Sequence, residues 1–244
     1  MCEACATTVE HVRIGRRNVL KLAAAAAAAM AIPRDARAAK AAAPPKPQNV
    51  LSPGAALERL MQGNARYVEG VGKRHDFRHE RETLSQGQNP FAGVLSCADS
   101  RIAPEYCFDT ARGDLFVCRV AGNFASDDIV ASFEYAVQVL NTPLILVLGH
   151  ESCGAVDATI KSLKDGTTLP GHLPALVTAL APAVDAVRDA PGDLLANATR
   201  RNVMHNVEKL KTAAPILKSF VDAKKVRVVG GVYELKTGRV ALLA

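Results

Sequence analysis

The chain has 244 residues, of which 49% are hydrophobic and 22% charged, a composition typical of a globular protein with one large or two small domains. Lysine and arginine number 30 against 24 acidic residues, but half of the net charge of +6 lies in the first 38 residues, so the remainder lacks the basic excess of a nucleic-acid-binding protein. Tryptophan is absent and aromatic residues make up only 5%, which argues against a surface that stacks bases or sugars.

The amino-terminal segment has the pattern of an export signal. Arg16 and Arg17 precede an alanine-rich apolar run over residues 22–32, and an Ala-x-Ala sequence ends at Ala38. A run of this length is too short to cross a bilayer, which needs about 20 apolar residues. The cluster resembles a twin-arginine signal peptide, and the simpler alternative is an alanine-rich tail without an export function.

These features divide the chain into three parts. We predict a signal peptide over residues 1–38, a flexible linker rich in Ala, Pro and Lys over 39–50, and a folded domain over 51–244 that works in the periplasm. Cys2 and Cys5 have the spacing of a metal or redox motif, but one such pair is a weak signal, and cleavage of the signal peptide would remove both.

Helical and strand patterns alternate through the folded domain. A helix is expected after Ser52, with Gly63 and Asn64 ending or bending it, followed by a polar loop or arm over 69–90. Strands are expected at 91–96, 115–119, 144–148, 226–233 and 240–243, and further helices at 127–140, 174–190, 193–210 and 215–223. This alternation predicts an α/β fold with a doubly wound, mainly parallel sheet flanked by helices.

Residues with metal-binding chemistry follow two of the apolar strands. Cys97 follows the first strand, and the central strand leads into His150 and Cys153. In an open α/β sheet, functional groups collect beyond the carboxyl ends of the strands, so these three side chains should meet. His150 and Cys153 are expected on one face at the start of a helix, whose amino-terminus favours a thiolate at Cys153. Two thiolates and an imidazole are a sufficient ligand set for a zinc ion that keeps a fourth position open.

The order of motifs resembles the β-class carbonic anhydrases. The resemblance covers nearly the whole domain, and its blocks are residues 60–67, 97–105, 113–123, 133–136, 148–156 and 232–238. It implies the β-carbonic-anhydrase-like fold, a Zn²⁺ cofactor and the reversible hydration of CO2 to bicarbonate and a proton. It also implies a homodimer or a larger homo-oligomer, in which the helix after Ser52 wraps a neighbouring subunit. No partner nucleic acid and no membrane span are expected.

The resemblance also assigns roles to single residues. Cys97, His150 and Cys153 would bind zinc, and Asp99 and Arg101 would form a dyad that orients a zinc-bound hydroxide for attack on CO2. In a closed form of the family, the counterpart of Asp99 instead becomes a fourth metal ligand. The family also has a bicarbonate-regulated subgroup that uses a tryptophan. This chain has no tryptophan, which favours the open, water-bound form.

Other functions remain compatible with parts of the pattern. A hydrolase of CS2 or carbonyl sulfide could use the same zinc scaffold, and residues near the ligands do not separate it from a carbonic anhydrase. A non-catalytic zinc- or bicarbonate-binding protein would not need the pair of Asp99 and Arg101. A thiol–disulfide oxidoreductase has the least support, because no C-x-x-C motif begins a core helix.

The remaining cysteines and histidines have simpler interpretations. Cys107 and Cys118 are expected to be packed thiols, although a disulfide between them is possible in an oxidising compartment. Histidines that could carry protons but more simply lie at the surface are His75, His79, His172 and His205.

Overall fold

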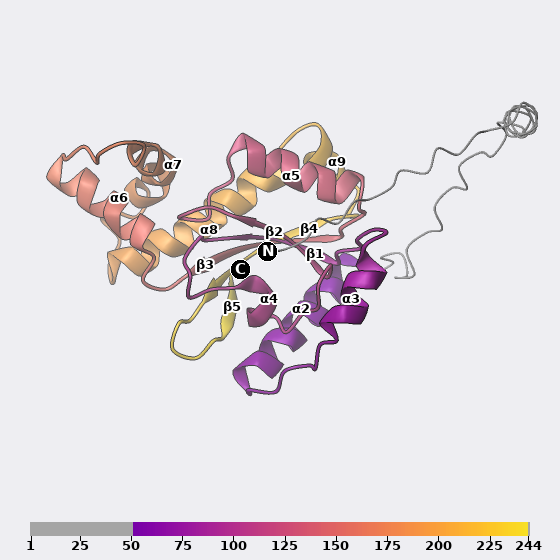
Figure 1. Cartoon of the computed structure of the whole chain (residues 1–244). Helices are drawn as coiled ribbons and strands as arrows, with labels where there is room; N and C mark the ends of the chain where they lie inside the picture. The colour runs from indigo at the N-terminus through magenta and orange to yellow at the C-terminus, as the bar shows by residue number, and fades with distance from the viewer. Residues whose placement is uncertain (1–50, 244) are drawn as a thin grey trace, which may run out of the picture. The chain divides into compact units, whose positions relative to one another are not determined.

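A mixed β-sheet forms the centre of the computed structural model, which describes residues 51–243 (Figure 1). Its strands in this part of the chain are β1 (Ala92–Ser96), β2 (Leu115–Arg119), β3 (Leu144–His150), β4 (Arg227–Tyr233) and β5 (Val240–Leu243). Their order is β2-β1-β3-β4-β5, in which β5 alone runs antiparallel to its neighbour. The predicted α/β fold with a mainly parallel sheet is confirmed.

Helices connect the strands and cover both faces of the sheet (Figure 1). They are α2 (Pro53–Val68), α3 (Phe77–Leu84), α4 (Pro104–Cys107), α5 (Asp127–Gln138), α6 (Gly154–Asp165), α7 (Pro174–Asp185), α8 (Leu194–Thr212) and α9 (Ile216–Asp222). Among residues 51–243, no helix is both long and apolar enough to cross a membrane.

The central strand β3 shows why the sheet needs two covering layers. Its seven residues are all buried, and alternate side chains of a strand point to opposite faces. Leu144, Leu146 and Leu148 pack in the cluster that contains residues of α2 and α4. Ile145 and Val147 pack in the cluster that contains residues of α5, α8 and α9. A continuous apolar run therefore predicts a strand buried on both sides, and the structure has one.

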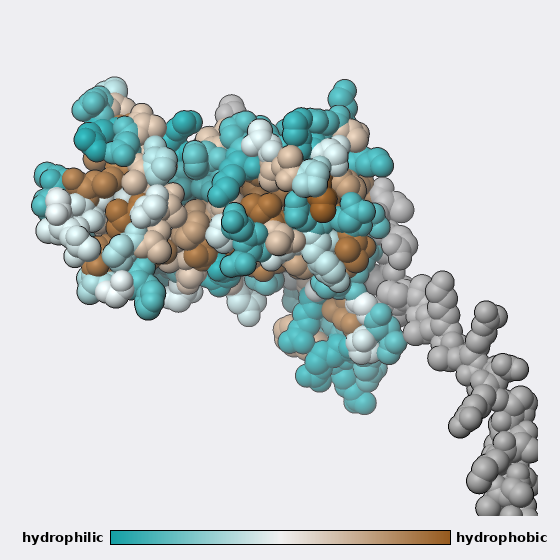
Figure 2. Space-filling view, turned by 90° about the horizontal axis from the view of Figure 1, so that it is seen from above, coloured by the Kyte–Doolittle hydropathy of each residue, from teal (hydrophilic) through white to brown (hydrophobic). Residues whose placement is uncertain are grey.

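The outer surface of the helical layers is mixed in character. The side of the molecule seen in Figure 2 carries hydrophobic residues interspersed with hydrophilic ones, as expected of helices that bury one apolar stripe. Some large apolar side chains nevertheless remain exposed, among them Tyr135 at 49% and Val139 at 55%, which lie on α5 and directly after it.

Helix α2 begins as predicted but does not end as predicted. The Ser52 hydroxyl accepts a hydrogen bond from the Ala55 N–H at 3.2 Å, which satisfies one of the free donors of the first turn. Gly63 and Asn64 lie inside the helix, so the expected end there is wrong. A Cβ at Gly63 would lie 1.9 Å from the carbonyl oxygen of Phe108, so this glycine allows close packing against the segment after α4.

Residues 69–90 also differ from the expectation, because α3 forms within the predicted loop. The Asp76 carboxylate accepts a hydrogen bond from the Arg78 N–H at 3.2 Å, which stabilises the first turn. Arg78 and Glu82 form an ion pair one turn apart, with 3.5 Å between their charged atoms. Asp76, directly before α3, is the residue in the sequence that could have indicated the start of this helix.

The predicted signal peptide and linker, with Cys2 and Cys5, lie outside the described residues. Helix α2 lies within them and packs its apolar side on the sheet of its own chain, through Ala56, Leu57 and Leu60.

Candidate metal centre

Two adjacent strands bring the predicted ligands together. Strands β1 and β3 are parallel neighbours with Ser96 opposite Leu148, so the residues beyond their carboxyl ends share one edge of the sheet. Ligand atoms of Cys97, His150 and Cys153 all lie within 4.8 Å of one another, and all three residues are buried. We call these three residues the ligand cluster.

The local structure that places the second and third ligands differs from the expectation. His150 is the last residue of β3, and Cys153 is the N-cap residue of α6, so the two do not share a helical face. The turn between them has Ser152 in the left-handed region, with φ of 52°. This turn of the backbone, rather than helical spacing, brings the Cys153 side chain beside the imidazole of His150.

The imidazole of His150 is oriented by its backbone neighbour. Its Nδ1 lies 2.8 Å from the Glu151 carbonyl oxygen, which only accepts, so Nδ1 carries the proton. Nε2 is then a free lone pair, and it is buried without a hydrogen-bond partner among the described residues. A buried imidazole nitrogen beside two thiols fits a metal ion, and zinc above all, because zinc prefers nitrogen and sulfur ligands.

The two thiols share one negative charge in the absence of a cation. The pKa of Cys97 is lowered to about 4, mainly because the Cys153 thiol donates a hydrogen bond to it, with a smaller contribution from the Gly122 N–H against the effect of burial. The neighbouring Cys97 thiolate and burial raise the pKa of Cys153. The two sulfur atoms thus hold one ionised thiol between them, and a bound cation would ionise both.

Asp99 and Arg101 form the predicted pair at the rim of the ligand cluster. The guanidinium donates to both carboxylate oxygens, from Nε at 2.9 Å and from Nη2 at 2.7 Å. This bidentate contact holds the pKa of Asp99 far below its usual range. The same carboxylate lies 3.9 Å from Nε2 of His150, so it faces the cluster while remaining bound to Arg101.

Arg119 supports the ligand cluster and was missed by the sequence reasoning. It lies at the end of β2, beside β1, and donates from Nε to the Cys97 carbonyl at 2.9 Å and from Nη2 to the Asp99 carbonyl at 2.7 Å. These two bonds fix the backbone that carries a ligand and the dyad carboxylate. The sequence placed Arg119 at the end of a strand, but its partners depend on the strand order.

Cys107 and Cys118 are free buried thiols rather than ligands or a disulfide. They belong to the clusters on opposite faces of the sheet, so the two sulfur atoms cannot meet. Burial raises the pKa of Cys107 to about 11 and also raises that of Cys118, which suits packed thiols.

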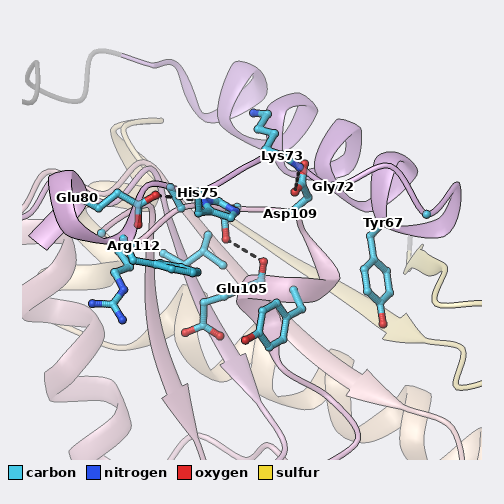
Figure 3. A pocket seen from close by; sticks show the side chains of 15 residues that line it. Tyr67, Gly72, Lys73, His75, Glu80, Glu105, Asp109 and Arg112 are labelled. Atoms are coloured by element: carbon cyan, nitrogen blue, oxygen red, sulfur yellow. Dashed lines mark hydrogen bonds and ion pairs between the residues drawn. The ribbon is translucent and has the colours of Figure 1, made fainter.

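A cavity of about 1040 Å³ lies beside α4 and shares no lining residue with the ligand cluster or the dyad. Glu80 and Arg112 lie at one end of it and Tyr67 at the other (Figure 3). His75 lines this cavity, where its ring pairs with Glu80 at 3.1 Å and stacks on Phe77. It is therefore partly buried and held in place, unlike the solvated loop residue that we expected.

The other histidines are simpler to place. His172 is exposed and His205 is half-buried on α8, and the side chain of His79 lies outside the described part. No hydrogen bond or ion pair joins His172 or His205 to the ligand cluster within residues 51–243.

Comparisons with known proteins agree with one another. A family profile described as carbonic anhydrase matches residues 92–240. The chain is 38% identical over 192 residues to carbonic anhydrase 2 of Mycobacterium tuberculosis, a match that covers 78% of this chain and 93% of the relative. The structure of the β-carbonic anhydrase CcaA superimposes with a TM-score of 0.60 at 28% identity, over 77% of this chain and 95% of that one. A tetrameric β-carbonic anhydrase from Sordaria macrospora, at 23% identity, shares the fold with a TM-score of 0.61 over 77% and 96% of the two chains.

Proposed function

We propose that this chain, which belongs to the β-class carbonic anhydrase family and catalyses the reversible hydration of CO2 to bicarbonate and a proton, does so at a zinc ion held by Cys97, His150 and Cys153. The observation that carries the proposal is the unpartnered Nε2 of His150, buried within 4.8 Å of the two sulfur atoms. Three protein ligands leave a fourth position for water, which a purely structural zinc site would fill with protein.

The residues around this position have separate tasks. Zinc supplies a nucleophile at neutral pH, because it lowers the pKa of bound water to about 7. Asp99 is an ionised acceptor 3.9 Å from Nε2 of His150, and its oxygens can accept a hydrogen bond from the attacking water and orient it. Arg101 keeps this carboxylate charged and holds both of its oxygens at the rim, where Asp99 would orient the water and would not itself bind the metal.

The test is a CO2 hydration assay on the protein from residue 39 onward, with its zinc content measured beside it. We expect about one zinc per chain and a loss of activity together with zinc in Cys97→Ser. The proposal is contradicted if Cys97→Ser keeps both the metal and the activity. Cys107→Ser serves as the matched control, since it changes a buried free thiol outside the ligand cluster.

The protein should act as a homodimer or a larger homo-oligomer. Large apolar side chains are exposed beside the cavity at α4, including Val71 at 59%, Phe77 at 57% and Tyr106 at 76%. Exposed apolar side chains gathered in one region are typical of protein–protein contacts. Light scattering during gel filtration should show at least twice the chain mass, and a fully active monomer would remove this part of the proposal.

Export by the twin-arginine route would explain the amino-terminal sequence. Unfolded Cys97 and Cys153 would risk disulfides in an oxidising compartment, whereas zinc loading in the cytoplasm before export would protect both thiolates. Replacing Arg16 and Arg17 with lysine should hold active enzyme in the cytoplasm. Cell fractionation that finds this double variant in the periplasm at wild-type levels would show that the segment is an ordinary signal or an uncleaved tail.

A further inference from the structure

One hydrogen bond to the ligand cluster comes from a loop that carries no ligand. The Gly122 N–H donates to Sγ of Cys97 at 3.3 Å, and the loop around it spans residues 120–126 between β2 and α5. Gly122 has a φ of 84°, and a Cβ there would lie 2.8 Å from Leu180. The glycine therefore lets the loop turn tightly enough to point its N–H at the sulfur.

Two buried asparagines on α8 hold this loop. Asn202 donates from Nδ2 to the Gly122 carbonyl at 2.8 Å, and Asn206 accepts from the Ala125 N–H at 2.7 Å. Asn206 also donates from Nδ2 to Oδ1 of Asn202 at 2.9 Å. That bond occupies the oxygen of Asn202 and so turns its nitrogen toward Gly122, which makes the two amides a single oriented chain of donors.

The same face of α8 packs against the strand that ends in His150. A Cβ at Gly149 would lie 2.6 Å from Val203, so the glycine allows the helix to approach β3 closely. Val203 is adjacent in sequence to Asn202. One rigid helix face thus contacts both the loop behind Cys97 and the residue before His150.

We infer that Asn202 and Asn206 are positioning residues, which set the affinity of the ligand cluster for zinc by holding the Gly122 N–H against Cys97. The inference rests on the proposed zinc site. Both asparagines are almost completely buried, at 1% and 2% exposed, so no solvent can replace them as partners of the loop. Outer hydrogen-bond partners of metal ligands typically change metal affinity by about 10–100-fold.

Asn64 offers a matched control for these residues. It is 3% exposed, donates to the carbonyls of Cys107 and Gly238, and accepts from the Val240 N–H, each at 2.9 Å. It therefore ties buried segments together as Asn202 does, but none of its partners contacts the ligand cluster. Its replacement should lower stability without altering the metal site.

The experiment compares Asn202→Leu with Asn64→Leu in the otherwise complete protein. Zinc affinity is measured by competition with a chromophoric chelator, the thiolate-to-metal band by absorption after Co²⁺ substitution, and stability by thermal unfolding of the metal-free protein. We expect Asn202→Leu to weaken zinc binding about 10–100-fold and to shift the Co²⁺ band, whereas Asn64→Leu lowers the unfolding temperature and leaves both readouts unchanged.

The outcomes separate this inference from the zinc site itself. If the wild-type protein binds zinc and Asn202→Leu binds it equally well, or if both variants lose affinity in proportion to stability, the positioning role is wrong. If the wild-type protein binds no zinc, the zinc assignment is wrong and the inference falls with it. Asn206→Ala leaves Asn202 in place but removes its orienting partner, and it decides the question by the same readouts if Asn202→Leu does not fold.

Discussion

Two buried polar groups of this protein differ in how completely their atoms are paired. The Asp109 carboxylate, only 8% exposed, accepts from Nε of Arg66 at 2.6 Å and from the Lys73 N–H at 2.8 Å, so both of its oxygens have partners. The ligand cluster instead keeps Nε2 of His150 buried without a partner. The first group ties the end of α2 to the segment after α4, and the second offers a nitrogen and two sulfur atoms that could bind a metal ion.

Glu80, Asn123 and Thr199 also have an unpaired buried atom among the described residues, so it is the two adjacent thiols, together with the free nitrogen, that mark the ligand cluster as a binding site. Leaving a buried polar atom without a partner costs about 1–3 kcal/mol, so such atoms are rare in native structures. A charged group whose atoms are all paired stabilises the folded state. An unpaired buried nitrogen destabilises it, and a cation bound by that nitrogen and the two thiols would remove this cost. Replacing residues of each kind should therefore affect different measurements.

The largest effect is expected from the sulfur ligands. The double variant Cys97→Ala, Cys153→Ala should lose its zinc and fall to the uncatalysed rate of CO2 hydration, because the pKa of water returns from about 7 to its bulk value of 15.7. Metal analysis and a stopped-flow hydration assay measure the two losses. The double variant Cys107→Ala, Cys118→Ala is the control, since both thiols are buried and free. If the two double variants lost the same amount of zinc, the assignment of Cys97 and Cys153 as ligands would be contradicted.

A smaller loss of activity, without loss of metal, is expected from the dyad. Asp99→Asn keeps the size of the side chain but cannot hold a full negative charge between Arg101 and the attacking water, and the loss of such a group commonly lowers rates by about 10²–10⁴. Zinc content should remain near one per chain. Asp109→Asn is the matched control, since it removes a paired carboxylate away from the cluster and should retain turnover. Wild-type turnover in Asp99→Asn would refute the role of the dyad.

The sequence was sufficient for those features that depend on local patterns. The strand at 115–119 has the predicted bounds, and the apolar run at 144–148 correctly indicated a parallel strand covered on both faces. Such runs are informative because a strand buried on both sides has no polar face. The adjacency of Cys97 and His150 followed from the rule that functional groups gather beyond strand ends.

Features that depend on contacts between distant segments could not be predicted. Gly63 looked like a helix terminator, but its role depends on the Phe108 carbonyl that packs against it. Arg119 lies 20 residues or more from both carbonyls that it binds, so no sequence spacing reveals the pair of bonds. Asn202 and Asn206 do leave a signal, because two amides one helical turn apart stand among apolar positions of α8.

The fully paired group should affect stability rather than activity. Asp109→Asn removes the charged partner of Arg66 and should lower the free energy of unfolding by about 1.5–3 kcal/mol at pH 7, the usual range for hydrogen bonds that involve a charged group. Urea unfolding of the zinc-free protein measures this loss without the contribution of metal binding. An unchanged midpoint would show that solvent around the 30% exposed Arg66 side chain screens the pair.

The smallest expected effect is the dependence of this contribution on pH, and its sign follows from the pKa of Asp109. Burial alone would raise that pKa, but the Arg66 guanidinium and the Lys73 N–H outweigh burial and bring it below the ordinary value of 3.8. The unfolded chain therefore takes up a proton at a higher pH than the folded protein does. The stabilisation is fully present above pH 3.8 and is lost as the pH falls through the pKa of the folded state.

The difference in unfolding free energy between the wild-type protein and Asp109→Asn should accordingly stay constant from pH 7 to about pH 5 and shrink below pH 4. The same comparison in an Arg66→Leu background isolates the cause, because the pKa of Asp109 then lacks its cationic partner and the pH-dependent part of the difference should decrease. A difference that grows as the pH falls would contradict the assigned direction of the pKa, and one that is unaffected by Arg66→Leu would mean that the Lys73 N–H alone holds the carboxylate ionised.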